Sequence, residues 1–306
     1  MAYSRRPARS SRLRGSSHYG KKKRGGANRR SSGRKRTYRK KTSIKKKILN
    51  MTARKKRNGM LTVSNTEGAG GIVPLANQPL TMNGNATHSI LWQATAQTLV
   101  PGSNVTQTAR RTATSCYMVG LSEHLKFQTS SPAPWFHRRI CFTYKDDDFR
   151  LTQAGDAPTV PYVTYYDSSV TGPQRLMYDA IPGAGLGNTI SKNNGIIFKG
   201  VQNVDWNDVI LAPTDTTRIT VKFDHTWVLR SGNAVGNVYE RKLYHPMNKT
   251  IVYDDDEEGI NMVPSYDSVG SKPGMGDYYV YDLYSPFASA TVTDQLRVFT
   301  NTTLYW

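Results

Sequence analysis

The first 57 residues of the chain contain 24 Lys and Arg residues and no Asp or Glu, and the first acidic residue is Glu67. The formal net charge of +20 therefore divides into +24 on this arm and −4 on residues 58–306, which hold 18 basic and 22 acidic residues. A segment with so much like charge and so few apolar side chains cannot bury a core. We therefore expect residues 1–57 to be a disordered arm and residues 58–306 to be the folded domain.

The composition favours strands in the folded domain. The chain holds 18 Tyr, 5 Trp and 8 Phe, and aromatic and β-branched residues are enriched in strands. In residues 218–230, apolar and polar residues alternate with a period of two, which is typical of a strand with one face in water. The apolar positions there are Ile219, Val221, Phe223, Trp227 and Leu229. Other segments with strand character are 89–94, 115–127, 135–144, 162–166, 195–201, 238–245, 277–284 and 291–300.

Clusters of Gly, Pro, Asn and Asp separate these segments, and residues 64–87 have the composition of a long loop or linker. The pattern predicts no long amphipathic helix and no internal repeat. About eight long strands with long connections indicate an all-β sandwich. Among sandwiches, a jelly roll fits the long loops better than an immunoglobulin-like fold.

The two cysteines, Cys116 and Cys141, exclude a disulfide-rich scaffold and fit a reducing compartment. Together with His124 and His137 they resemble a zinc ligand set, but on one strand Cys116 and His124 would stand roughly 26 Å apart. We expect both cysteines to be buried structural residues, and we predict no metal and no other cofactor. The acidic runs 146–148 and 254–258 lack EF-hand spacing, which leaves solvated loops and a divalent-ion site as alternatives.

No catalytic motif is found, so no enzyme activity is predicted. The six histidines form no His-x-His pair, and neither G-x-S-x-G nor H-E-x-x-H occurs. Residues 15–22 nearly match a phosphate-binding loop, but Lys22 replaces the final Ser or Thr and no strand precedes them. No apolar run reaches the roughly 18 residues of a membrane span. The arm also lacks the apolar face of a mitochondrial transit peptide.

The arm requires a polyanionic partner, because only opposite charge relieves its self-repulsion. Phosphate neutralisation with release of counterions gives strong, salt-dependent binding to nucleic acid, and the tyrosines of the arm can stack on unpaired bases. The same basic clusters are typical of nuclear localisation signals. In the folded domain, Arg110-Arg111 and Arg138-Arg139 are candidates for nucleotide contacts or for ion pairs between subunits. The predicted DNA-binding residues of the arm are Arg5, Arg6, Arg9, Arg12, Arg14, Lys21, Lys22, Lys23, Arg24, Arg29, Arg30, Arg34, Lys35, Arg36, Arg39, Lys40, Lys41, Lys45, Lys46, Lys47, Arg54, Lys55, Lys56 and Arg57.

Four stretches of the chain resemble the capsid proteins of genomoviruses, which are relatives of the geminiviruses. They are Met1-Ala2-Tyr3 with the Arg and Ser that follow, KKILNMTARKKRN at 46–58, WFHRRICF at 135–142 and YDLYSP at 281–286. A geminivirus coat protein is the near alternative. The sequence shows no cysteine–histidine finger of the type often proposed for those proteins, which weighs slightly against it. The resemblance implies a jelly-roll subunit that self-assembles into a small icosahedral shell around circular single-stranded DNA and delivers that DNA to the host nucleus.

The charge of the arm agrees with this expectation. Closed symmetry permits a shell of sixty copies, whose arms would carry roughly 1,440 positive charges, enough for about that many nucleotides. The expected partners are further copies of the chain, single-stranded DNA and the host nuclear import machinery, without a membrane, and the expected locations are the virion and the host nucleus. The alternative is a host-type nuclear nucleic-acid-binding protein with a basic tail, which should also carry basic and aromatic side chains on its folded domain.

Overall fold

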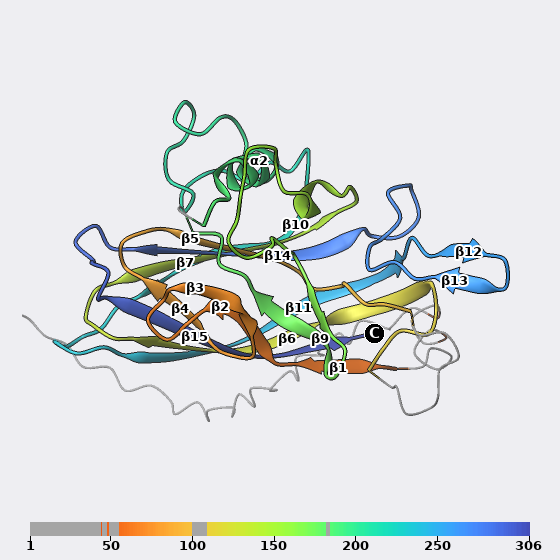
Figure 1. Ribbon diagram of the computed structural model, residues 1–306, viewed down its shortest axis with the longest axis horizontal. Helices are drawn as coiled ribbons and strands as arrows, with labels where there is room; N and C mark the ends of the chain where they lie inside the picture. Colours follow the sequence, from red (N-terminus) through yellow and green to blue (C-terminus); the bar gives the residue numbers. More distant parts are fainter. Residues whose placement is uncertain (1–43, 45–47, 49–54, 100–108, 182–183) are drawn as a thin grey trace, which may run out of the picture. The chain divides into compact units, whose positions relative to one another are not determined.

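The computed structural model describes residues 44, 48, 55–99, 109–181 and 184–306 (Figure 1). The chain divides into two compact units, Met1–Met51 and Thr52–Trp306. The predicted disorder of the arm falls outside the described residues, except that Ile44 and Ile48 have helical backbone and exposed side chains. The second unit contains all the strands described below.

Two antiparallel sheets form the domain. In the first, β15 (Gln295–Tyr305) pairs with β6 (Ser115–Thr129) on one side and with both β1 (Arg57–Met60) and β4 (Leu80–Asn83) on the other, and β11 (Val238–Val252) pairs with β6. In the second, the order is β10 (Thr220–Leu229), β7 (Trp135–Tyr144), β14 (Asp277–Pro286) and β5 (His88–Gln93). If β4, β5, β6, β7, β10, β11, β14 and β15 are numbered one to eight, the two sheets read 1-8-3-6 and 2-7-4-5. This is the strand order of a jelly roll, so the predicted fold class is confirmed.

The core lies between these sheets and follows the period of two along each strand. Trp92 of β5 and Val280 of β14 belong to one cluster with Leu121 of β6 and Leu304 of β15, and all four are buried. A second cluster continues the core toward the other end of the same strands, around Trp135. Full burial of a large apolar side chain contributes about 1.5–3 kcal/mol, so the alternating apolar positions fix the register of both sheets.

A long insertion between β7 and β10 covers the outer face of the second sheet. It contains η1 (Asp148–Arg150), β8 (Tyr166–Ser168), β9 (Gly172–Met177) and α2 (Gly187–Ile197), and in Figure 1 α2 lies over the sheet that contains β14. Phe149 of the insertion packs on Phe142 and Tyr279 of this sheet, and Phe198 packs on Tyr281. A small sheet of β3 (Ile72–Ala76), β2 (Thr62–Thr66), β9 and β8 lies beside the sandwich, and β12 (Asp256–Glu258) pairs with β13 (Asn261–Val263). Within the described residues, no helix is long and apolar enough to cross a membrane.

The strand predictions are confirmed at six segments: 89–94, 115–127, 135–144, 218–230, 238–245 and 277–284. The last strand begins later than predicted and runs from Gln295 to Tyr305. The predicted strand 195–201 is wrong, because residues up to Ile197 belong to α2, and 162–166 is irregular apart from its last residue.

The prediction of a loop at 64–87 is also wrong, because this region carries most of β2 and all of β3 and β4. The segment lacks the apolar alternation of a strand, because polar side chains occupy some of its interior positions. The Nδ2 group of Asn65 donates to the backbone O of Asp179 at 3.0 Å, and the backbone N–H of Asp179 donates to Asn65 Oδ1 at 2.7 Å. A buried amide with both ends satisfied is compatible with a strand in the interior.

The alternation predicted for residues 218–230 is partly confirmed, because β10 has a bulge at Lys222. Val221 lies opposite Phe142 of β7, whereas Phe223 lies opposite Cys141. The additional residue turns the strand over. The apolar side chains before the bulge therefore pack with the insertion, and those after it face the interior between the sheets.

Candidate nucleic-acid interface

The last residues of the predicted arm enter the first sheet. Of the 24 predicted DNA-binding residues, only Lys55, Lys56 and Arg57 lie in the described part of the chain, and the others, from Arg5 to Arg54, lie outside it. Lys55 and Arg57 are exposed, and Arg57 is the first residue of β1.

Lys56 has a structural role that the sequence did not reveal. Its Nζ donates to the backbone O of Arg110 at 2.6 Å and to Thr112 Oγ1 at 3.1 Å. Its backbone exchanges two hydrogen bonds with Trp306, at 2.6 and 3.0 Å. Lys56 therefore fastens the start of the domain to its last residue, and Lys55 and Arg57 on either side carry the cations that face solvent.

The sheet that Arg57 enters has an exposed outer face, in contrast to the covered second sheet. On this face, residues that lie opposite one another on β1, β15, β6 and β11 form five rows across the sheet. The rows are Arg57–Tyr305–Gly120–Pro246, Gly59–Thr303–Ser122–Tyr244, Asn301–His124–Lys242, Phe299–Lys126–Glu240 and Arg297–Gln128–Val238. All of these residues are exposed or half-buried except Gly120, and Thr81 of β4, which lies opposite Arg297, is also buried. A Cβ atom at Gly120 would stand 2.7 Å from the Tyr244 hydroxyl oxygen, so glycine makes room for this ring.

We call this surface the basic sheet face. It carries Arg57, Lys126, Lys242 and Arg297 together with His124, and its one carboxylate is Glu240, although the folded domain as a whole has more acids than bases. Aromatic rings lie among the charges. The Lys126 ammonium stands 4.4 Å from the centre of the Phe299 ring, and Tyr244 is 54 % exposed. Cations beside exposed rings are the combination that tracks phosphates and stacks bases of a single strand.

The candidate arginine pairs of the folded domain are engaged inside the chain instead. Arg111 and Arg139 have no exposed side-chain surface, and the Arg138 side chain is 7 % exposed. Because Arg138 and Arg139 are adjacent on β7, they point to opposite faces of the sheet. The interpretation that these arginines contact nucleotides or a neighbouring subunit is therefore wrong for the three buried ones. The pairs are Arg110–Asp167, Arg111–Asp255, Arg138–Asp224 and Arg139–Asp282.

A closed charge cluster lies in the middle of the sandwich. Arg139 bonds Asp282 through Nε at 2.7 Å and Nη2 at 2.9 Å, and it also contacts Glu123. Arg175 of β9 joins the same two carboxylates, at 2.9 Å to Glu123 and 2.8 Å to Asp282. Burial opposes ionisation of both acids, but the charge of Arg139 overrides it, so the pKa of Glu123 is lowered and that of Asp282 lies well below its usual range. Two cations and two anions thus balance in the core.

The zinc set considered from the sequence does not come together. Cys116 and Cys141 are buried free thiols, as predicted, and burial raises the pKa of Cys141 to about 12. His124 is on the exposed basic sheet face, whereas His137 is buried and bonds Asp282 at 2.9 Å. In residues 55–99, 109–181 and 184–306, no three His, Cys, Asp or Glu side chains are arranged to hold a metal ion.

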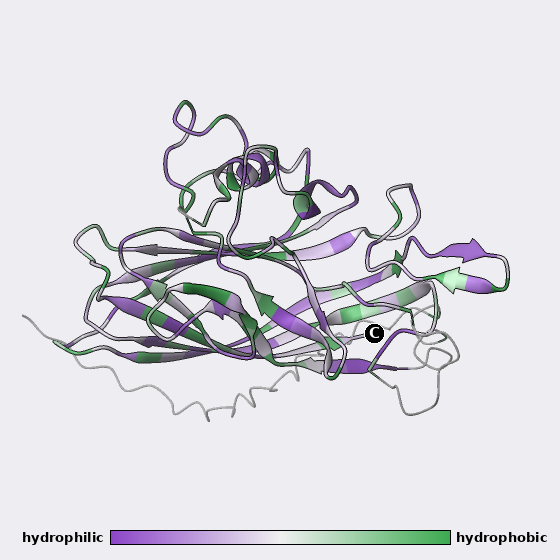
Figure 2. Cartoon of the chain, in the orientation of Figure 1, coloured by the Kyte–Doolittle hydropathy of each residue, from purple (hydrophilic) through white to green (hydrophobic). Residues whose placement is uncertain are grey.

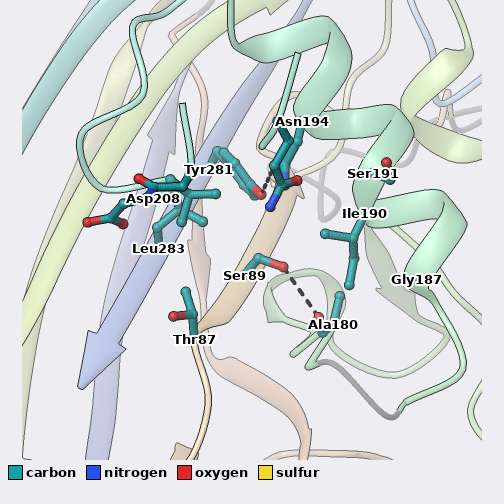
Figure 3. A pocket seen from close by; sticks show the side chains of 13 residues that line it. Thr87, Ser89, Ala180, Gly187, Ile190, Ser191, Asn194, Asp208, Tyr281 and Leu283 are labelled. Atoms are coloured by element: carbon teal, nitrogen blue, oxygen red, sulfur yellow. Dashed lines mark hydrogen bonds between the residues drawn. The ribbon is translucent and has the colours of Figure 1, made fainter. Parts of the chain in front are cut away.

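A cavity of about 420 Å³ lies between α2 and the second sheet (Figure 3). Hydroxyl and amide groups dominate its polar lining. The Tyr281 hydroxyl donates to Asn194 Oδ1 at 2.8 Å, and Asp208 is the one carboxylate. Because no basic side chain is among the described residues that line this cavity, it does not suit a phosphate group.

Replacing His245 by leucine is expected to reduce the acid sensitivity of the domain. Burial, followed by the charge of Arg139, lowers the pKa of His245 from 6.5 to about 4. Between these values the unfolded chain binds a proton that the native state does not, so His245 costs stability as the pH falls. The variant should therefore gain about 3 kcal/mol relative to the original protein between pH 7 and pH 4, as measured by urea unfolding. A difference that stays constant with pH would contradict this.

A scan against protein-family models finds no match, and a search of the curated proteins finds none.

Proposed function

We propose that this protein is a viral capsid subunit that self-assembles into a small icosahedral shell and packages circular single-stranded DNA. The arm of 24 basic residues supplies most of the charge for packaging and also carries nuclear localisation signals. The proposal places the protein in the virion and in the host nucleus. It extends the resemblance to genomovirus capsid proteins noted at residues 46–58, 135–142 and 281–286.

The observation that carries the proposal is that the two sheets of the jelly roll present different outer surfaces. One sheet is covered by the insertion that contains α2, and the other presents the basic sheet face. The polycationic arm joins the domain at Arg57, on the strand at the edge of that same face. The chain segment that leads to the arm and the basic sheet face thus belong to the same sheet, which suits a wall with nucleic acid on one side only.

The charge of the folded domain also favours assembly. Residues 58–306 carry a formal charge of −4, so the folded domains of neighbouring subunits repel each other only weakly. The larger charge is confined to the arm, where sixty copies neutralise about 1,440 phosphates.

The basic sheet face also favours a second candidate, a nuclear nucleic-acid-binding protein with a basic tail. Such a protein would use basic and aromatic groups on its folded domain in the same way. The two candidates differ in assembly, since only a capsid subunit forms closed shells of uniform size.

The test is to express the full chain, image it by negative-stain microscopy and measure its nuclease-protected DNA. We expect closed particles of uniform diameter that protect single-stranded DNA. A protein that binds DNA but stays monomeric across salt and DNA concentrations would refute the capsid function and support the second candidate.

The double variant Lys126→Ala/Lys242→Ala tests the basic sheet face. We expect the slope of log affinity against log salt for a single-stranded oligonucleotide to fall by about 1.4, because two phosphate contacts are lost. The matched control is Lys199→Ala/Lys272→Ala, which removes two exposed lysines outside this face. Equal changes in the two double variants would show that the face has no special role.

A further inference from the structure

The hairpin formed by β12 and β13 exposes apolar and acidic side chains together. Every residue of its two strands is exposed, and the turn residue Ile260 is 101 % exposed. Its strands pair only with each other among the described residues, and the hairpin projects away from the two sheets (Figure 1). Figure 2 shows a hydrophilic β12 beside a partly hydrophobic β13. A lone two-stranded hairpin with an apolar tip is marginally stable in water, so it gains from a partner surface.

The base of the hairpin is firmly anchored. Asp255, the residue directly before β12, forms a fully buried ion pair with Arg111. Ser265, which follows β13, donates its backbone N–H to Asp255 at 2.9 Å and accepts from Arg111 through its backbone O at 2.6 Å. The Arg111 guanidinium also stacks on the Tyr253 ring at 3.9 Å. Both ends of the hairpin are thus held at the same point, and the tip is presented in a defined direction.

A complementary patch lies on the edge strands β10 and β11. Lys222 is at the bulge of β10, and Lys249 is at the register shift of β11. Both side chains are exposed, and neither forms an ion pair with a described residue. Burial and the nearby charge of Lys249 lower the pKa of Lys222, so the two ammonium groups are close enough to repel each other. Bulges in edge strands redirect side chains and prevent strand addition.

We propose that the hairpin of one subunit docks against the Lys222–Lys249 patch of a second copy of this chain. The acidic residues Asp256, Glu257 and Glu258 neutralise the two lysines, and charge complementarity fixes the register of the contact. Ile260 loses its full exposure to water in the docked state and supplies apolar contact area. This inference rests on the proposed self-assembly, and it names the contact through which two copies associate.

The test compares charge-reversed variants of the full chain by size-exclusion chromatography. The hairpin variant Asp256→Lys/Glu257→Lys/Glu258→Lys and the patch variant Lys222→Glu/Lys249→Glu should each reduce the assembled fraction at least tenfold. Combining all five substitutions in one chain reverses both partners, and the assembled fraction should return to within twofold of the original protein. Thermal unfolding of each variant checks the fold, which should not change because all five side chains are exposed.

The variant Ile260→Ser tests the same contact without any change of charge, and it should also reduce assembly. If the original protein fails to assemble, the proposed function and this inference fall together. If the original protein assembles and the hairpin variant assembles equally well, only this inference is refuted. Lack of rescue in the combined variant refutes the lysine patch as the acceptor. A patch variant that keeps intact particles but loses DNA assigns the lysines to the genome and refutes the contact.

Discussion

Replacing Asp282 by asparagine is expected to lower the free energy of unfolding by about 3–5 kcal/mol. Asp282 accepts hydrogen bonds from Arg139, Arg175 and His137, and none of these side chains is exposed. Asparagine keeps the shape but removes the negative charge, so two buried guanidinium groups share the single carboxylate of Glu123. Denaturant unfolding of the full chain at pH 7 measures the loss.

The matched control is Asp224→Asn on β10, which pairs with the opposite side of β7. Asp224 also forms a two-point pair with an arginine, at 2.9 and 2.7 Å from Arg138, but its side chain is 26 % exposed. Arg138 keeps three backbone carbonyl acceptors in the insertion after this change. We expect a loss of about 1 kcal/mol or less. Similar losses in the two variants would contradict the special role of the closed charge cluster.

Deleting residues 1–43 is expected to reduce the DNA in each particle to roughly a third. The deletion removes 17 of the 24 basic residues of the arm and leaves seven. Neutralisation of the phosphates depends on the number of basic residues and not on their order in the sequence. The length of the packaged DNA should therefore fall in about the same proportion. Nuclease-protected nucleotides per subunit, measured on purified particles, give this ratio directly.

Two controls separate charge from other effects of the deletion. The folded domain should unfold at the same temperature as in the full chain, since the described domain begins after the deleted segment. An arm with the same composition in scrambled order should package as much DNA as the original arm. If the deletion leaves the DNA content unchanged, the arm is not the packaging element.

The sequence predicted the strands of the sandwich well, because their apolar residues alternate and large aromatic residues mark the core. It did not predict the point at which β10 turns over, since the bulge at Lys222 depends on the register with β7. It also did not predict α2. Three of the four residues that this helix buries are polar, namely Thr189, Asn193 and Asn194, and the fourth is Ile197. Only the surrounding insertion makes the polar positions interior.

The closed charge cluster could have been found from a signal that the sequence contains. Glu123 and Asp282 each stand at an inward position of a strand that is otherwise apolar or aromatic. Arg139 has the same position on β7. Two lone acids and a lone base at core positions indicate partners across the sandwich, because an unpaired buried charge is too costly to keep. The contribution of Arg175 from the insertion could not be predicted, since it depends on the parallel pairing of β2 with β9.

The pairing of Lys56 with Trp306 has a practical consequence if the protein forms the proposed shell. Because the backbones of these two residues bond to each other, a peptide fused after Trp306 would leave the domain at the same sheet edge as the arm. In the proposed shell, such a cargo would lie on the same side of the wall as the genome. A label intended for the outside of the particle is therefore better inserted in the insertion that covers the second sheet.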